Sequence, residues 1–268
     1  MANNRPIGVF DSGLGGLTVV KELNKILEFE DIVYFGDTGR VPYGNRSIDT
    51  IKRYAAEDEE FLLSRDVKAI IAACGTVSSV AADVSKKLPI PFFEVVSHAS
   101  KMACETTKNK KIGVIGTAAT IKSGKHKEYI LKNLPDAKVV CQSCPLFVPL
   151  VEEGWYSADD VVVEETIKRY LEPMIKAEVD TLILGCTHYP VLENAISKVL
   201  GDTVKLINAG TATAKAVLEF LEKEDMLKGE GQGNIEFFVS DKADSFRHQA
   251  SILLGREIDD SKVKTVIL

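Results

Sequence analysis

The sequence predicts an α/β protein made of two copies of one unit, each a mainly parallel sheet with helices. Two apolar runs end in a cysteine, in Ala69–Thr76 (AIIAACGT) and Thr181–His188 (TLILGCTH). Upstream of each, Ile7–Gly13 (IGVFDSG) is echoed by Ile112–Ala118 (IGVIGTA). An Ile-Gly-Val opening alone is common in α/β strands, but the offset between copies is similar, 105 residues for the upstream pair and 112 for the cysteine pair. Two matches in the same order favour a duplicated unit with a small insertion.

The first element is a strand from Ile7 that ends at the glycine-rich turn Asp11–Gly16 (DSGLGG). A helical pattern follows at Leu17–Leu27, so the turn lies where nucleotide-binding loops occur. Its spacing fits neither G-x-G-x-x-G nor a P-loop, and no lysine directly follows the last glycine. We therefore interpret it as a tight turn that presents a carboxylate and a hydroxyl at the carboxyl end of a strand.

The two repeated cysteines, Cys74 and Cys186, follow runs with the length and branched content of buried parallel strands. In both copies a threonine-bearing turn leads into a helical pattern. Ligands bind beyond the carboxyl ends of parallel strands, and a helix N-terminus favours an anionic sulfur there. Two matched thiols at such positions indicate chemistry on two faces of one molecule.

Two further segments interrupt the regular pattern. Asp37–Gly44 (DTGRVPYG) is predicted to be a strand end followed by a turn, because Pro-Tyr-Gly continues neither a strand nor a helix. In Cys144–Gly154 (CPLFVPLVEEG), two prolines break an apolar stretch, which by itself indicates an extended core segment followed by a solvated pair of carboxylates. Cys141 and Cys144 have C-x-x-C spacing, but without a second pair a zinc site is disfavoured, and we interpret them as buried or bystander thiols.

The segment Lys228–Asn234 (KGEGQGN) is the clearest flexible connector in the chain. Beyond it, the pattern predicts a strand over Ile235–Val239 and a helix over Ala243–Leu254. Both elements lie outside the two repeats. We expect them to complete one lobe and to leave the other lobe as a contiguous insert.

Composition argues against several classes of protein. The 268 residues are 45% apolar, enough for one large core or two smaller ones, and the net charge of −6 provides no basic field for nucleic acid or an anionic membrane. The start, Met1–Pro6, leads straight into a strand without a charged and then apolar leader, and no apolar run approaches membrane-spanning length. Five cysteines, an odd number, fit free thiols in a reducing compartment. We therefore expect a cytoplasmic protein.

Five motifs, taken in chain order, resemble those of glutamate racemases, and the resemblance covers nearly the whole chain. They are Asp11–Gly16, Val41–Gly44, Cys74 with Thr76, Cys144–Gly154 and Gly185–Pro190. The resemblance implies an α/β fold of two pseudo-symmetric lobes with the active site in the interlobe cleft. It also implies cofactor-independent interconversion of L- and D-glutamate, which supplies D-glutamate for peptidoglycan synthesis.

The predicted lobes follow from this resemblance together with the internal repeat. Lobe one comprises residues 1–96 plus 209–268, and lobe two comprises residues 97–208. Lobe one would carry Asp11 and Cys74, and lobe two would carry Glu152, Cys186 and His188.

The resemblance assigns Cys74 and Cys186 as the two acid–base groups, one on each face of the substrate's α-carbon. A thiolate on one side removes the α-proton and a thiol on the other side replaces it. Asp11 is implied to assist Cys74, and Glu152 with His188 to assist Cys186. Read from the residues alone, Asp11 could instead be only a turn residue or helix cap, and His188 could cap the following helix or satisfy a backbone carbonyl, but we favour the catalytic roles.

A dicarboxylate substrate must be held mainly by neutral donors, because the motifs contain no arginine cluster. The implied binding residues are Asp11, Ser12, Tyr43, Gly44, Gly75, Thr76, Thr120, Thr187 and His188. Gly75 departs from the family pattern, in which an Asn follows the first cysteine. We expect backbone N–H groups and water to take the place of that amide, so that Gly75→Asn modestly lowers the Michaelis constant unless Gly75 has a positive φ.

Two other functions remain open from the sequence. One is racemisation of aspartate or another acidic amino acid, and the other is a thiol redox or metal-binding module without catalysis. No motif indicates pyridoxal phosphate, a nicotinamide or a metal, so we expect no cofactor and no metal site. The expected partner is the small-molecule substrate, with no nucleic acid or membrane, and the resemblance implies a homodimer.

Overall fold

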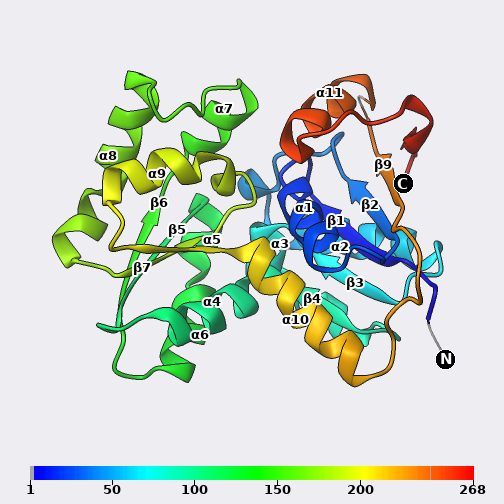
Figure 1. The fold of residues 1–268 in the computed structure, drawn as a ribbon, viewed down its shortest axis with the longest axis horizontal. Coiled ribbons are helices and arrows are strands. Elements are labelled where there is room, and N and C mark those ends of the chain that lie inside the picture. Colours follow the sequence, from blue (N-terminus) through cyan, green and yellow to red (C-terminus); the bar gives the residue numbers. More distant parts are fainter. Residues whose placement is uncertain (1–2, 242) are drawn as a thin grey trace.

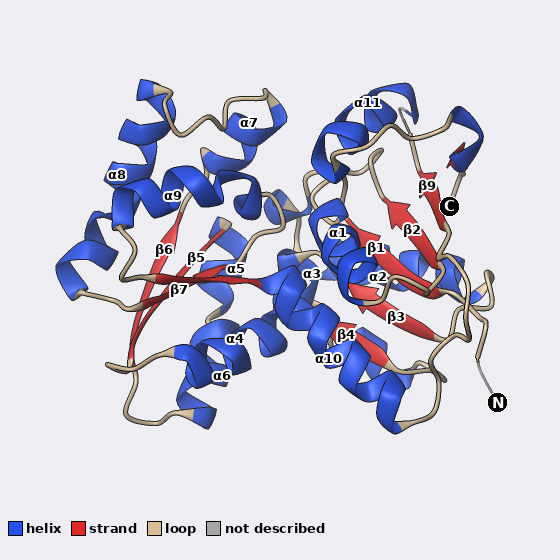
Figure 2. Ribbon diagram, viewed as in Figure 1, coloured by secondary structure: helices blue, strands red, loops and turns tan. Residues whose placement is uncertain are grey.

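The computed structural model describes residues 3–241 and 243–268. Residues 1, 2 and 242, which fall within predicted lobe one, lie outside the described residues. Strands and helices alternate along the chain and form two parallel sheets, each with helices packed around it (Figures 1 and 2). The predicted α/β class is confirmed.

The strands of the described residues are β1 Ile7–Asp11, β2 Ile32–Gly36, β3 Ala69–Ala72, β4 Phe92–Glu94, β5 Lys111–Gly116, β6 Lys138–Ser143, β7 Thr181–Leu184, β8 Lys205–Asn208, β9 Ile235–Val239 and β10 Val263–Thr265. The α-helices are α1 Leu17–Ile26, α2 Ile48–Leu63, α3 Gly75–Val80, α4 Val95–Thr106, α5 Ala118–Ser123, α6 Lys125–Asn133, α7 Phe147–Glu152, α8 Val161–Ala177, α9 Glu193–Leu200, α10 Ala209–Lys223 and α11 Ala243–Leu254. Short 3₁₀ turns occur at Tyr43–Asn45, Val84–Lys87, Tyr189–Leu192 and Asp260–Lys262.

The internal repeat of the sequence is also a repeat of sheet topology. The first sheet has the order β10-β9-β2-β1-β3-β4 and the second has the order β6-β5-β7-β8. The last four strands of the first sheet therefore match the whole of the second. Ile7 pairs with Ala69 in one sheet and Ile112 pairs with Thr181 in the other, which are the residues that the repeat relates. Both cysteines consequently follow the strand that neighbours the Ile-Gly-Val strand.

Both ends of the chain contribute to the first sheet. In Figure 1 the blue, cyan and red segments lie on the same side of the molecule, and the green segments form the other side. The predicted strand Ile235–Val239 and helix Ala243–Leu254 are confirmed as β9 and α11, and β9 pairs with β2. The chain leaves this side through α4, which contains the predicted boundary at residues 96 and 97, and returns at α10.

The core explains why the central strands are apolar at every position. Strands β1, β2 and β3 are buried along their whole length, because helices cover both faces of the sheet. Helix α10 packs against both α1 and α4, and one continuous apolar cluster contains residues from both sheets. Burial of a Val, Leu or Ile side chain contributes about 1.5–3 kcal/mol to the stability of the fold, so this shared cluster stabilises the packing of the two sheets against each other.

One local expectation is wrong. The segment after Cys144 is helical, as α7, rather than extended: Pro149 lies in the first turn, where a backbone N–H has no intrahelical acceptor to lose. After the second repeated cysteine, the predicted turn leads into helical structure, first a 3₁₀ turn at Tyr189–Leu192 and then α9. In the described part of the chain, every helix is too short or too polar to cross a bilayer.

Candidate active site

A cavity of about 330 Å³ opens where the carboxyl ends of the central strands of both sheets meet. It is lined by all of the predicted site residues except one: Ser12, Tyr43, Gly44, Cys74, Gly75, Thr76, Thr120, Glu152, Cys186, Thr187 and His188. The exception is Asp11, which is buried at the end of β1 and does not line the cavity. The cavity is therefore lined by residues that follow strands of both sheets, and one of the two repeated cysteines comes from each side.

Cys74 is the residue before the first turn of α3, directly after strand β3. Its thiol lies 3.6 Å from the hydroxyl oxygen of Ser12. Burial and the nearby charge of Asp11 raise the pKa of the Cys74 thiol to about 12, against the opposing effect of backbone N–H groups of α3. These surroundings favour the protonated thiol of Cys74 over its thiolate.

Asp11 lies at the end of β1, and its charge acts on Cys74. One carboxylate oxygen, Oδ2, accepts the backbone N–H of Gly13 at 2.9 Å. The other, Oδ1, is buried and accepts no hydrogen bond from the residues that the structure describes. Burial raises the pKa of this carboxyl, while the charge of His188 and the backbone N–H groups of the turn lower it. A buried oxygen with an unused lone pair can act as a proton acceptor.

Cys186 has a different set of neighbours. Its sulfur lies 3.9 Å from Nδ1 of His188, and Nε2 of the same ring lies 3.3 Å from Oε1 of Glu152. Burial lowers the pKa of His188, but the hydrogen bond to Cys186, the contact with Glu152 and the charge of Asp11 outweigh it and raise the pKa to about 10. A charged imidazole that donates to sulfur stabilises the thiolate form. Glu152, the last residue of α7, is half-exposed and connects this chain of contacts to solvent.

The glycine-rich turn has a role that the sequence did not reveal. A β-carbon on Gly15 would lie 2.1 Å from the hydroxyl oxygen of Thr187 and 2.6 Å from Nδ1 of His188. The side chain of Thr18, on α1, reaches the same place, with its hydroxyl 2.8 Å from the carbonyl oxygen of Thr187. The glycine allows the turn after β1 to touch the turn that follows β7. The sequence signal was a glycine-rich turn that fits no phosphate-binding spacing.

Gly75 is also at a point of close approach. A β-carbon there would lie 2.7 Å from the backbone carbonyl oxygen of Gly185 and 3.6 Å from the hydroxyl oxygen of Thr120. The φ angle of Gly75 is outside the left-handed region, so the restriction comes from Gly185 and not from backbone strain. The expectation that Gly75→Asn modestly lowers the Michaelis constant stays a prediction, and this close approach acts against it, because a side chain at position 75 requires the two turns to move apart.

The remaining thiols differ from this pair. Cys144 also lines the cavity but is fully buried, and its thiol donates weakly to the carbonyl of Gln142 at 3.8 Å. Cys141 and Cys104 are half-buried and outside the cavity. Each cysteine of the described chain is a free thiol.

Comparison with known proteins agrees with this geometry. The family model described as Asp/Glu/Hydantoin racemase matches residues 7–217. The chain belongs to this family. Strands β9 and β10 and helix α11 lie beyond the matched residues.

Relatives within the family are similar over nearly their whole length. The chain is 43% identical over 258 residues to a glutamate racemase from Geobacter metallireducens, covering 96% of this chain and 95% of the relative. A glutamate racemase isoform from Bacillus anthracis has a solved structure that superposes with a TM-score of 0.94, at 37% identity, covering 99% of this chain and 98% of that one. A glutamate racemase from Francisella tularensis in complex with D-glutamate gives a TM-score of 0.89 at 39% identity, covering 99% and 97%. The predicted resemblance is confirmed.

Proposed function

We propose that the protein interconverts L- and D-glutamate by a two-base reaction in which Cys74 and Cys186 are the acid–base residues. The main support for this proposal is that the two thiols, which follow β3 and β7 in two different sheets, line a single cavity. The similar racemases, including one bound to D-glutamate, supply the reaction and the substrate. D-Glutamate made in this way is a precursor for peptidoglycan, which is the family's known role.

The proposed reaction moves two protons and no other atom. A thiolate on one side takes the α-proton of glutamate, which leaves an electron pair on the α-carbon. The thiol on the opposite side gives its proton to that carbon, so the centre inverts and the thiolate is now on the other sulfur. The next turnover in the same direction requires both sulfurs to return to their starting protonation states.

The groups beside the two sulfurs can give and take the protons that this reaction requires. The unpaired oxygen of Asp11 can take the proton of Cys74, whose own pKa is too high for it to ionise unaided at neutral pH. On the other side His188 can give a proton to Cys186 or take one from it, and Glu152 stabilises the charged imidazole. We propose Asp11, Glu152 and His188 as the assisting groups on these grounds.

Substrate binding is proposed to use the hydroxyls and backbone amides around the cavity. Ser12, Thr76, Thr120 and Thr187 present hydroxyls, and the turn at Tyr43 and Gly44 presents backbone N–H groups. Gly44 lies between a residue that follows the first sheet's β3 and one that follows the second sheet's β5. A β-carbon on Gly44 would be 3.8 Å from the hydroxyl oxygen of Thr76 and 3.9 Å from that of Thr117. Gly75 is proposed to contribute only its backbone.

The experiment that tests the function is solvent exchange. Purified protein in D₂O, without added cofactor, is given D-glutamate or L-glutamate; circular dichroism follows racemisation and NMR follows loss of the α-hydrogen. We expect both signals for wild type and loss of at least about 10³-fold in racemisation for Cys74→Ser and Cys186→Ser, because a serine hydroxyl is a poor base at neutral pH. Cys104→Ser and Cys141→Ser, thiols outside the cavity, are the matched controls.

Other outcomes separate the alternatives. Exchange with aspartate in preference to glutamate would replace the substrate assignment by a related acidic amino acid. Absence of exchange with any amino acid, together with reversible oxidation of the two thiols, would favour a redox module. Full activity of either cysteine variant would remove that residue from the mechanism.

Two further expectations, on the cellular location and on the oligomeric state, are also proposals. We propose that the protein acts in the cytoplasm, consistent with its free thiols, and that it forms a homodimer, as the family resemblance implies. Analytical ultracentrifugation with and without glutamate tests the second of these.

A further inference from the structure

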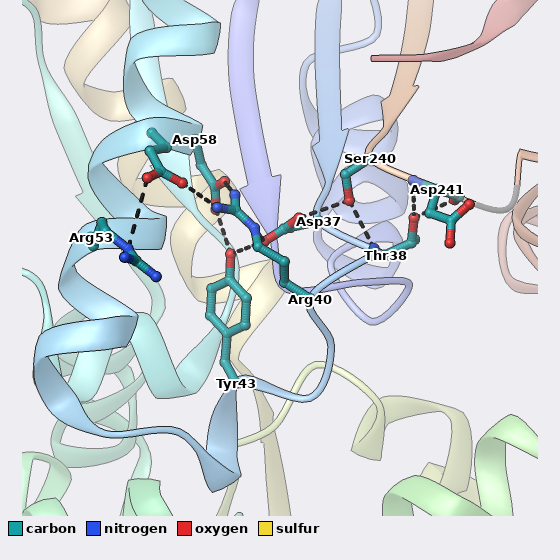
Figure 3. A network of polar contacts seen from close by, with 10 residues as sticks. Asp37, Thr38, Arg40, Tyr43, Arg53, Asp58, Ser240 and Asp241 are labelled. Carbon is teal, nitrogen blue, oxygen red and sulfur yellow. Dashed lines mark hydrogen bonds and ion pairs between the residues drawn. The ribbon is translucent and has the colours of Figure 1, made fainter. Parts of the chain in front are cut away.

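The loop that carries Tyr43 and Gly44 into the cavity is held by a buried polar network on its far side. The Tyr43 side chain is buried, and Figure 3 shows its hydroxyl pointing toward Asp37 and Asp58. Asp58 belongs to α2, whereas Asp37 opens the loop itself, directly after β2. Because the tyrosine hydroxyl is occupied there, the ring fixes the loop instead of reaching the substrate.

Asp37 is surrounded by donors. Nε of Arg40 lies 2.5 Å from its Oδ2, and the hydroxyl of Tyr43 donates to the same oxygen. The hydroxyl of Ser240 donates to Oδ1 at 2.7 Å, since its own oxygen accepts the backbone N–H of Gly39. Each oxygen of Asp37 therefore receives a hydroxyl donor, so both oxygens of this carboxyl group act as acceptors.

Asp58 meets the same tyrosine hydroxyl from the other side, and this arrangement favours its neutral form. Its Oδ1 accepts a bond from Nη2 of Arg40 at 3.1 Å, and its Oδ2 lies 3.0 Å from the hydroxyl oxygen of Tyr43. The single proton of that hydroxyl is already directed to Asp37. Two acceptor oxygens at 3.0 Å need a proton between them, so Asp58 must supply it. Burial and the charge of Asp37 act in the same direction, since both raise the pKa of Asp58.

The network joins three parts of the chain that are distant in sequence. Arg40 also pairs with Glu57 on α2, and its guanidinium lies 4.1 Å from the centre of the Tyr54 ring. At the end of β9, the backbone N–H of Asp241 donates to the hydroxyl of Thr38 at 3.0 Å. The loop is therefore fixed between α2 and the segment that follows β9, and β9 lies beyond residues 7–217, which the family model matches.

We propose that Asp58, as a neutral carboxylic acid, is a positioning residue that sets the place of the Tyr43–Gly44 backbone in the glutamate-binding cavity. The proposal rests on the proposed function, because the loop matters only if its backbone N–H groups hold the substrate. It assigns a role in substrate binding to a side chain that does not itself line the cavity.

The test compares a neutral isostere with an apolar one. In Asp58→Asn the amide donates to Tyr43 and its oxygen accepts from Arg40, so we expect kcat and the Michaelis constant for D-glutamate to stay within about twofold of wild type. In Asp58→Leu the tyrosine hydroxyl and Arg40 lose their partner, and we expect the Michaelis constant to rise roughly tenfold, with a smaller change in kcat. Glu60→Leu, on the exposed face of α2, is the control for the helix.

A second measurement does not depend on activity. The infrared spectrum of wild type minus Asp58→Asn should contain the carbonyl stretch of a protonated carboxylic acid, shifted in D₂O. A carboxylate band in its place would overturn the proposal, as would equal losses in Asp58→Asn and Asp58→Leu. A folded Asp58→Leu with the wild-type Michaelis constant would also overturn it.

Failure of the proposed function would be seen separately, as a wild-type protein that does not racemise glutamate. Melting temperatures of all variants, measured alongside, identify any variant that loses activity through unfolding. For such a variant the infrared comparison of wild type and Asp58→Asn still decides the protonation of Asp58.

Discussion

The carbonyl oxygen of Gly185 lies 2.7 Å from the place that a β-carbon of Gly75 would occupy. Gly75 follows the first repeated cysteine and Gly185 precedes the second, so the two catalytic turns touch at the residues beside the proposed bases. The absence of a side chain at position 75 allows this approach.

The contact gives a specific expectation for substitutions at position 75. Gly75→Ala adds only a β-carbon and should already reduce kcat/KM for glutamate by about tenfold or more, because a contact below 3 Å forces the turns apart. Gly75→Asn should be no better, although it restores the family's amide. Steady-state kinetics in both directions measure this, and a lower Michaelis constant in Gly75→Asn than in wild type would show that the turns separate at little cost.

His188 is expected to affect turnover more than binding. His188→Asn removes the ring that links Cys186 to Glu152, and general acid–base groups typically contribute 10²–10⁴-fold, so we expect kcat to fall by roughly that factor. The two directions can be affected unequally, but the final mixture must remain racemic. His98→Asn, on α4 and outside the cavity, is the control. A change confined to the Michaelis constant would make His188 a binding group.

The same histidine predicts a pH dependence of stability. Its pKa is raised from an ordinary value of 6.5 to about 10, so the folded state is stabilised by the charged ring. That contribution is fully present below about pH 6.5 and is lost as the pH rises through about 10. The melting temperature of wild type minus that of His188→Gln should therefore decline between these two pH values. A difference that is constant or grows with pH would contradict the shift.

Thr18 is expected to connect the two proposed lobes. Its buried hydroxyl lies 2.8 Å from the carbonyl oxygen of Thr187 and 2.9 Å from that of Gly15. Thr18→Val keeps the shape but removes the hydroxyl donor of the Thr187 carbonyl, at a cost of about 1–3 kcal/mol in the free energy of unfolding, whereas Thr18→Ser keeps the hydroxyl. Urea unfolding of the two variants measures the difference. Equal stabilities would show that the bond contributes nothing.

The sequence by itself determined the class of fold and the positions of the thiols. Apolar runs of strand length, followed by turns, placed Cys74 and Cys186 at strand ends, and the internal repeat predicted a duplicated α/β unit. The strand at β9 and the helix at α11 were also readable. These features depend on local periodicity, which is present in a single sequence.

Tertiary structure decided what depends on segments that are distant in the chain. The close approaches of Gly15 to His188 and of Gly75 to Gly185 exist only because the two sheets meet at their carboxyl edges. Ser240 and Asp37 are separated by 203 residues, yet they share a hydrogen bond because β9 lies beside β2. Even α7 escaped prediction, since a proline permitted in a first helical turn resembles one that breaks a strand. Close approach between backbones is set by the packing of whole elements, and no local pattern records it.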